Sequence, residues 1–147
     1  MPLRVATAAD VPAIAALVRA AYARWVPLIG REPLPMQADY DAAVREHAID
    51  LLYDDGELVG LIETIARPDH LFIENLAVRP QSQGRGFGRH LLAHAEDKAR
   101  HLGRDELRLL TNAAFEANIR LYEATGYRID RRENFMGGVT VHMSLRI

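Results

Sequence analysis

The sequence contains no cysteine, which excludes disulfides, thiolate metal sites and any thiol nucleophile that would carry an acyl group covalently. Serine is nearly as scarce: only Ser82 and Ser144 occur, and neither lies in the G-x-S-x-G pattern of a serine nucleophile. If the protein handles acyl groups, direct attack by the acceptor on the acyl donor is therefore the favoured route.

The chain also lacks an excess of charge of either sign, because 18 basic residues face 20 acidic ones. A nucleic-acid partner is not expected from such a balance. No apolar run approaches the roughly 18 residues of a membrane span, and the opening Met-Pro-Leu-Arg-Val is unlike a signal peptide. We expect a cytoplasmic protein without a membrane partner, folded as a single domain over residues 1–147.

Hydrophobic periodicity and turn residues predict alternating helices and strands. The predicted elements are a strand at 3–6, a helix at 11–25, an irregular loop at 27–35, a helix at 37–47, strands at 49–53, 58–66 and 71–78, a helix at 87–102, a strand at 107–111, a helix at 116–125, and strands at 127–131 and 139–146. The pairs Asp55-Gly56 and Gly137-Gly138 are typical of tight hairpin turns.

The third long strand has an irregular apolar pattern. Its large apolar residues lie at odd positions in Leu71 and Ile73 but at even positions in Leu76 and Val78. Side chains alternate between the two faces of a strand, so one inserted residue reverses the parity. The pattern predicts a β-bulge near Glu74-Asn75.

A glycine-rich hexamer, Gln83-Gly84-Arg85-Gly86-Phe87-Gly88, lies between this strand and the next helix. Missing side chains let backbone N–H groups approach an anion, and the helix dipole attracts phosphate. A Rossmann fingerprint needs a third glycine where Arg89 stands, and a P-loop needs Gly-Lys-Ser/Thr, which is absent. By itself the hexamer fits an anion site and a flexible connection equally well.

Two ordered motifs make the chain resemble the GNAT superfamily of N-acetyltransferases over almost its whole length. The first comprises Gln83, Gly86 and Gly88 after the strand 73–78 and Pro80; the second comprises Asn118 and then Leu121 to Tyr127. The resemblance implies an α/β fold of the α+β type: a mostly antiparallel twisted sheet of about seven strands, with a bulged and splayed central strand, flanked by about four helices.

The resemblance also implies that acetyl-CoA is the co-substrate and that no metal is needed. Backbone amides of 84–89 would bind its pyrophosphate, 76–78 would pair with the pantetheine arm, and an N–H near Leu76 would stabilise the developing oxyanion. The implied coenzyme-binding residues are Leu76, Ala77, Val78, Gln83, Gly84, Arg85, Gly86, Phe87, Gly88, Arg89, Asn118 and Tyr122.

By the same resemblance, Tyr122 is the general acid that protonates the departing thiolate, and Asn118, one helical turn earlier, contacts the pantetheine or the tyrosine. The base is Glu74 first and Glu63 second, since burial would raise a carboxyl pKa into a useful range. The alternatives are a tyrosine that only packs in the core, an asparagine exposed at a helix start, and a Glu74 that faces solvent.

A histidine stripe on the helix 87–102 suggests a metal site at first sight, through His90, His94, Asp97 and His101. His90 and His101 lie about 16 Å apart along the helix axis, so one ion cannot reach both. The stripe lies opposite the apolar face, and we interpret it as the solvated side.

The acceptor is expected to be a primary amine on a small molecule or a peptide, and a free amino acid, polyamine, antibiotic, peptide terminus and protein lysine all stay open. The pocket candidates implied by the resemblance are Tyr22, Trp25, Tyr40, Phe135 and His142. Each also fits an ordinary core position or a contact in a homodimer. Two other functions stay open, a non-catalytic acyl-CoA sensor or assembly module and a nicotinamide-binding domain.

Overall fold

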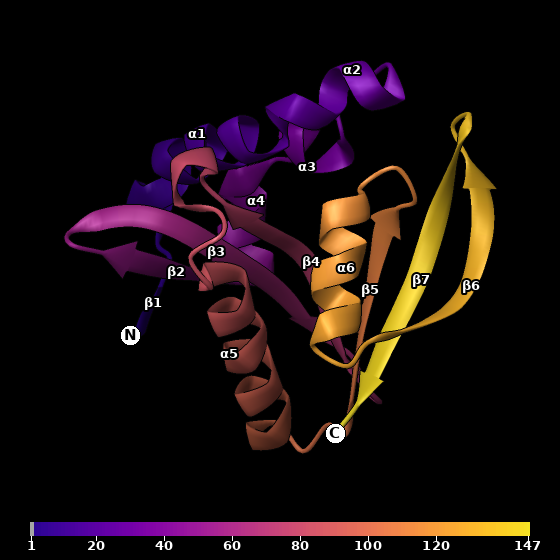
Figure 1. The fold of residues 1–147 in the computed structure, drawn as a ribbon. Helices are drawn as coiled ribbons and strands as arrows, with labels where there is room; N and C mark the ends of the chain where they lie inside the picture. The colour runs from indigo at the N-terminus through magenta and orange to yellow at the C-terminus, as the bar shows by residue number, and fades with distance from the viewer. Residues whose placement is uncertain (1) are drawn as a thin grey trace.

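The computed structural model describes residues 2–147 and contains one seven-stranded sheet in the order β1-β2-β3-β4-β5-β7-β6 (Figure 1). Neighbouring strands are antiparallel except β4 and β5, which are parallel. The strands are β1 (Leu3–Val5), β2 (Ala48–Asp54), β3 (Glu57–Ala66), β4 (Leu71–Val78), β5 (Glu106–Asn112), β6 (Arg128–Phe135) and β7 (Gly138–Arg146). The helices are α1 (Val11–Tyr22), α2 (Val26–Ile29), α3 (Leu34–Gln37), α4 (Tyr40–Glu46), α5 (Phe87–His101) and α6 (Glu116–Ala124), with short 3-10 helices at Ala8–Asp10, Ala23–Trp25 and Pro80–Ser82.

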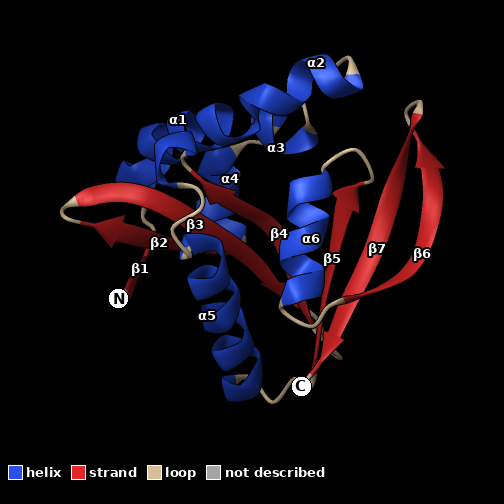
Figure 2. Ribbon diagram, in the orientation of Figure 1, coloured by secondary structure: helices blue, strands red, loops and turns tan. Residues whose placement is uncertain are grey.

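Helices cover both faces of the sheet (Figure 2). The helices α5 and α6 pack on one face through a core cluster that includes Leu91 and Tyr122, and α1 and α4 pack on the other through a cluster that includes Ile14. The adjacent residues Leu51 and Leu52 of β2 belong to opposite clusters, as strand alternation requires. The predicted fold class is confirmed.

The parity change in β4 is a β-bulge, as the sequence predicts. Asn75 pairs with Glu63 and Ile73 pairs with Thr64, so Glu74 is the extra residue with no partner of its own in the ladder. Before and after the bulge the large apolar side chains pack in the same cluster. The bulge therefore keeps one face of β4 apolar along its whole length.

The sheet opens between β4 and β5. Only Leu71–Ile73 of β4 pair with Leu107–Leu109 of β5, although both strands continue well past these residues. On its other side β5 pairs with β7 along its whole length. Beyond Ile73 and Leu109 the two strands diverge, and the edges of β4 and β5 that face each other are no longer paired (Figure 1).

Two predictions of local structure are wrong. The segment 27–35 is not an irregular loop, because it contributes to two short helices, α2 and α3, and α2 ends at Gly30 with a φ of 75°. The last hairpin turns on Met136 and Gly137, whose φ angles are 50° and 80°, while Gly138 already belongs to β7.

The histidine stripe of α5 is not uniformly solvated. His94 and Lys98 reach the buried carboxylate of Asp50 on β2, at 3.0 and 3.2 Å. Within residues 2–147 no group of three His, Cys, Asp or Glu side chains is arranged to hold a metal ion. The same residues include no helix with the length and apolarity to cross a membrane.

Candidate active site

Two cavities meet at the splay between β4 and β5. The larger, about 460 Å³, lies between the α3–α4 region and the strands β4 and β5, and the smaller, about 370 Å³, follows the glycine-rich segment. Tyr22, Leu76 and Asn118 line both cavities. A long ligand in the smaller cavity would thus reach the larger one across Leu76.

The glycines of the smaller cavity serve two different purposes. Gly84 and Gly86 have φ angles of 80° and 85°, in the left-handed region that favours glycine, and open space surrounds the position of a Cβ at either residue. A Cβ at Gly88 would lie 2.9 Å from the Leu121 side chain, so this glycine lets α5 pack closely on α6. The result is an uncrowded backbone turn at the N-terminus of a 15-residue helix, which is a favourable place for phosphate.

Alternate residues of β4 direct their backbone N–H and C=O groups toward the side where β5 has diverged. Arg79, just past β4, donates its N–H to the Val59 carbonyl at 2.9 Å, which makes the pair of residues 79 and 59 a hydrogen-bonded one. Hydrogen-bonded and non-bonded pairs alternate in an antiparallel ladder, so Val78 and Leu76 direct their backbone groups away from β3. These groups face the side from which β5 has diverged.

Two side chains engage the carbonyls on this side of β4. The Tyr22 hydroxyl approaches the Leu76 carbonyl at 3.3 Å, and the Gln83 amide donates to the Val78 carbonyl at 3.0 Å. The N–H groups of Leu76 and Val78 are left as donors for a ligand in the groove. Gln83, the first residue of the glycine-rich motif, therefore braces the strand that precedes it.

A buried hydrogen-bonded chain fixes the wall of the larger cavity beneath the bulge. The Tyr22 hydroxyl donates to Asn75 Oδ1 at 2.8 Å, Asn75 Nδ2 donates to the Tyr40 hydroxyl at 3.1 Å, and that hydroxyl donates to the Pro35 carbonyl at 2.7 Å. Burial raises the pKa of both tyrosines far above the ordinary value, so both remain neutral donors. Asn75 was missed as a site residue, although a polar residue beside a bulge in an apolar strand was a usable signal.

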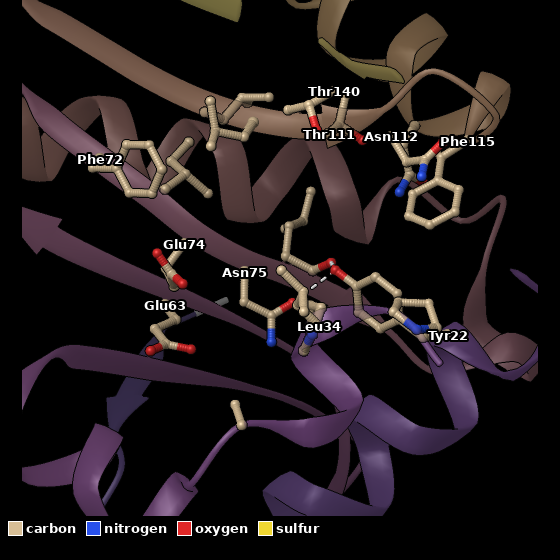
Figure 3. A pocket seen from close by; sticks show the side chains of 18 of the residues that line it. Tyr22, Leu34, Glu63, Phe72, Glu74, Asn75, Thr111, Asn112, Phe115 and Thr140 are labelled. Carbon is tan, nitrogen blue, oxygen red and sulfur yellow. Dashed lines mark hydrogen bonds between the residues drawn. The ribbon is translucent and has the colours of Figure 1, made fainter. Parts of the chain in front are cut away.

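Glu74 and Glu63 form a carboxylate pair next to Asn75 (Figure 3). Glu63 is 3% exposed and lies 2.6 Å from His47 Nδ1. Glu74 is exposed to the cavity, and no described residue bonds to its carboxylate. Burial by the cavity walls, and then the nearby charge of Glu63, raise the pKa of Glu74. Of the two carboxyl groups, Glu74 is the one with oxygens free to take a proton.

Tyr122 projects from α6 into the larger cavity. Its side chain is 6% exposed, burial raises its pKa well above the ordinary tyrosine value, and no described residue bonds to its hydroxyl. Asn118 lies one turn earlier on the same helix face and lines both cavities. The hydroxyl is thus a neutral donor near the junction of the two cavities.

The structure distributes the other predicted residues between the cavities and their surroundings. Tyr22, Tyr40 and Phe135 line the larger cavity, whereas Trp25 lines the smaller one and stacks on Phe115 at 4.6 Å. His142 lines neither cavity and lies 2.7 Å from Glu133. The predicted coenzyme residues that line the smaller cavity are Leu76, Ala77, Val78, Gln83, Gly84, Gly86, Phe87, Gly88, Arg89 and Asn118.

Arg85 is placed outside the smaller cavity and pairs instead with Asp54 at 3.3 Å. Sequence reasoning missed two cations beside the cavities, Arg24 in the smaller and Arg31 in the larger. Neither belongs to a motif, and each reaches its cavity only through the placement of the segment after α1.

The chain matches the model of the acetyltransferase (GNAT) family over residues 14–127. It is 38% identical over 109 residues to an amino-acid acetyltransferase of Neisseria meningitidis, covering 69% of this chain but 22% of that protein. It is 35% identical over 74 residues to the N-acetyltransferase YvbK of Bacillus subtilis, covering 50% of this chain and 48% of that one. The chain thus spans less than half the length of these relatives.

Solved structures show the same fold at low identity. The PaiA N-acetyltransferase of Thermoplasma acidophilum, in complex with coenzyme A, superimposes with a TM-score of 0.84 at 15% identity over 100% of both chains. The ribosomal-protein-S18-alanine N-acetyltransferase of Escherichia coli superimposes with a TM-score of 0.81 at 22% identity, covering 99% of this chain and 93% of that one.

Proposed function

Because the chain belongs to the acetyltransferase (GNAT) family, we propose that it transfers the acetyl group of acetyl-CoA directly to a primary amine. The observation that carries the proposal is the junction of the two cavities at Leu76. It joins a groove along the glycine-rich segment to a pocket that contains the Glu74 carboxylate and the Tyr122 hydroxyl, neither of which bonds to a described residue. Acyl transfer through an enzyme thioester has no candidate, since cysteine is absent.

The smaller cavity fits the coenzyme. The turn at 84–88 and the start of α5 would hold the pyrophosphate, with Arg24 and Arg89 as cations in the groove. Neither arginine has an ion-pair partner among the described residues. The N–H groups of Leu76 and Val78 would pair with the pantetheine amides, and the one at Leu76 would stabilise the thioester oxygen as it gains charge.

The bond changes follow from this placement. Glu74 first takes a proton from the acceptor ammonium, and the amine lone pair then attacks the thioester carbonyl carbon. The new N–C bond forms as the carbonyl electrons move to oxygen; they return as the C–S bond breaks and sulfur leaves with its electron pair. Tyr122 supplies the proton that converts the thiolate to free coenzyme A. The second proton, lost by the nitrogen as it becomes an amide, restores the Tyr122 hydroxyl, and Glu74 passes the first proton to water. The products are the N-acetyl amine and the thiol.

The raised pKa values suit these roles to different degrees. A carboxyl with a raised pKa is a stronger base toward an ammonium group, which favours Glu74. The raised pKa of Tyr122 keeps its proton in place over the whole neutral range but makes the donor weaker. The pH dependence of the reaction should therefore reflect Glu74 and the amine rather than the tyrosine.

A non-catalytic acyl-CoA sensor with the same fold is the second candidate. Such a sensor would bind the coenzyme in the same groove along the glycine-rich segment. It would have no use for Glu74 or for the Tyr122 hydroxyl, neither of which bonds to a described residue. Two measurements separate the candidates: calorimetric titration with acetyl-CoA, and release of free thiol across a library of primary amines.

Gly86→Glu and Gly103→Glu form a matched pair for the binding test. Both glycines have left-handed φ angles, 85° and 71°, both have open space around a Cβ, and they lie at opposite ends of α5. Only Gly86 lines the groove. We expect Gly86→Glu to abolish coenzyme binding and Gly103→Glu to retain it. Binding without thiol release would favour the sensor, and no binding by the folded parent protein would refute both candidates.

A further inference from the structure

Arg31 lines the larger cavity and has no role in the bond changes described above. It follows Gly30 between α2 and α3, and its guanidinium carbon lies 5.9 Å from the centre of the Phe135 ring on the β6–β7 hairpin. Its Nε is buried with no hydrogen-bond partner among the described residues, and Nη1 makes one long contact, 3.4 Å, to the Glu32 carbonyl. Most of the donor capacity of this cation is unused.

A guanidinium in this state calls for an explanation. Buried N–H groups in native proteins nearly always have an acceptor, and an orphaned one is explained by strain, an ordered water, an ion or a ligand. The planar guanidinium presents paired N–H groups that match the two oxygens of a carboxylate. The missing acceptor is therefore best supplied by an anionic group that enters the cavity.

The acids of the cavity do not supply that acceptor. Glu63 is held by His47, Asp39 caps α4 by accepting from the Ala42 N–H, and Glu133 is held by His142 and Arg131. Glu74 and Glu46 line the cavity with no bonded partner among the described residues. The cavity therefore offers both a free cation and free carboxylates to its contents.

We propose that the acceptor is an amino carboxylate, whose carboxylate pairs with the Arg31 guanidinium while its amine faces Glu74. The proposal rests on the proposed acetyl transfer and narrows its acceptor. A free amino acid and a short peptide both present these two groups. A diamine presents a second cation instead, which would meet Arg31 with like charge.

The test compares acceptors that differ only in charge. The rate of thiol release is measured for an amino acid series, for the same amino acids as carboxamides, for dipeptides, and for diamines of similar length. We expect kcat/KM for the carboxylates to exceed that for the carboxamides by about 10- to 100-fold, the range that one charge-assisted hydrogen bond contributes. A preference for free amino acids over dipeptides, or the reverse, identifies the source of the carboxylate.

Arg31→Gln should remove this preference by raising KM for the carboxylates with little change in kcat, and should leave the carboxamides within about twofold. Arg31→Lys should restore part of it. Arg45→Gln is the matched control, since this arginine lies outside both cavities and the substitution removes the same charge.

Equal rates for carboxylates and carboxamides in the parent protein, or a preference for diamines, would overturn the proposal even if no Arg31 variant folds. Turnover of carboxamides or diamines would still support the acetyl transfer. Absence of thiol release with every acceptor would instead refute the acetyl transfer, and the assignment of Arg31 with it.

Discussion

Replacing Tyr122 by phenylalanine removes one oxygen from a buried wall of the larger cavity. Because the side chain is 6% exposed and its hydroxyl has no described partner, the fold loses no hydrogen bond, and the free energy of unfolding should change by less than about 1 kcal/mol. A lost general acid should lower kcat by about 10²- to 10⁴-fold, which corresponds to roughly 3 to 5 kcal/mol. Calorimetry should show coenzyme affinity nearly unchanged, because Tyr122 lines the larger cavity rather than the groove.

Tyr127→Phe is the control for this experiment. Its ring lies 5.9 Å from that of Tyr122, its side chain is 3% exposed, and its hydroxyl is buried without a described partner, but it lines neither cavity. We expect parental turnover and an unfolding free energy that is equal or higher by roughly 1 kcal/mol. If Tyr122→Phe released coenzyme A at the parent rate over a broad pH range, or if both variants lost turnover equally, the general-acid assignment would be wrong.

Three further substitutions test other parts of the structure. Glu74→Gln should move the acidic limb of the kcat/KM profile to higher pH, because only acceptor that has already lost its ammonium proton could then react; an unchanged limb would assign the base to another group. Burial is the largest single influence on Asp50 and opposes its charge, but the hydrogen bonds and charges of His94 and Lys98 together outweigh it and hold the pKa below the usual value. This stabilisation is present above about pH 4 and is lost as the pH falls through the native pKa, so Asp50→Asn should cost about 1 to 3 kcal/mol at neutral pH in denaturant unfolding, and progressively less in acid. A deficit that did not depend on pH would contradict that reasoning. Gly88→Ala should lower the melting temperature by several degrees, because its Cβ would lie 2.9 Å from Leu121; an unchanged melting temperature would show that the Leu121 side chain moves aside at little cost.

The bulge in β4 was predictable because it leaves a trace in the sequence. A strand with one apolar face has a period of two, and an inserted residue shifts that period by one, as it does between Ile73 and Leu76. The two short helices in 26–37 left no such trace. Each has a proline near its start, Pro27 and Pro35, where a proline costs no hydrogen bond, so a composition typical of a loop is also compatible with a first helical turn.

The glycine-rich segment and the α6 motif were found in the sequence because each is contiguous. The polar contacts of the larger cavity are not contiguous: Tyr22 and Asn75 lie 53 positions apart, and Asn75 and Tyr40 lie 35 apart. Such pairs depend on how α1 and α4 pack on the sheet, which local patterns do not encode. The free state of Arg31 was equally hidden, since it depends on which acids already have partners.

The bulge in β4 and the splay between β4 and β5 together position the groups to which the proposed acetyl transfer is assigned. The bulge makes Glu74 the residue of β4 without a ladder partner, and β4 parts from β5 immediately before it, after Ile73. The same short segment therefore provides the free carboxylate and, at Leu76, a backbone N–H that faces the gap. If the extra residue lay one position later, Glu74 would occupy a paired position and the amide of Asn75 would be displaced from Tyr22. The proposed site therefore depends on the backbone irregularity, because a regular strand would direct the Glu74 carboxylate and the hydrogen-bonded Asn75 to opposite faces.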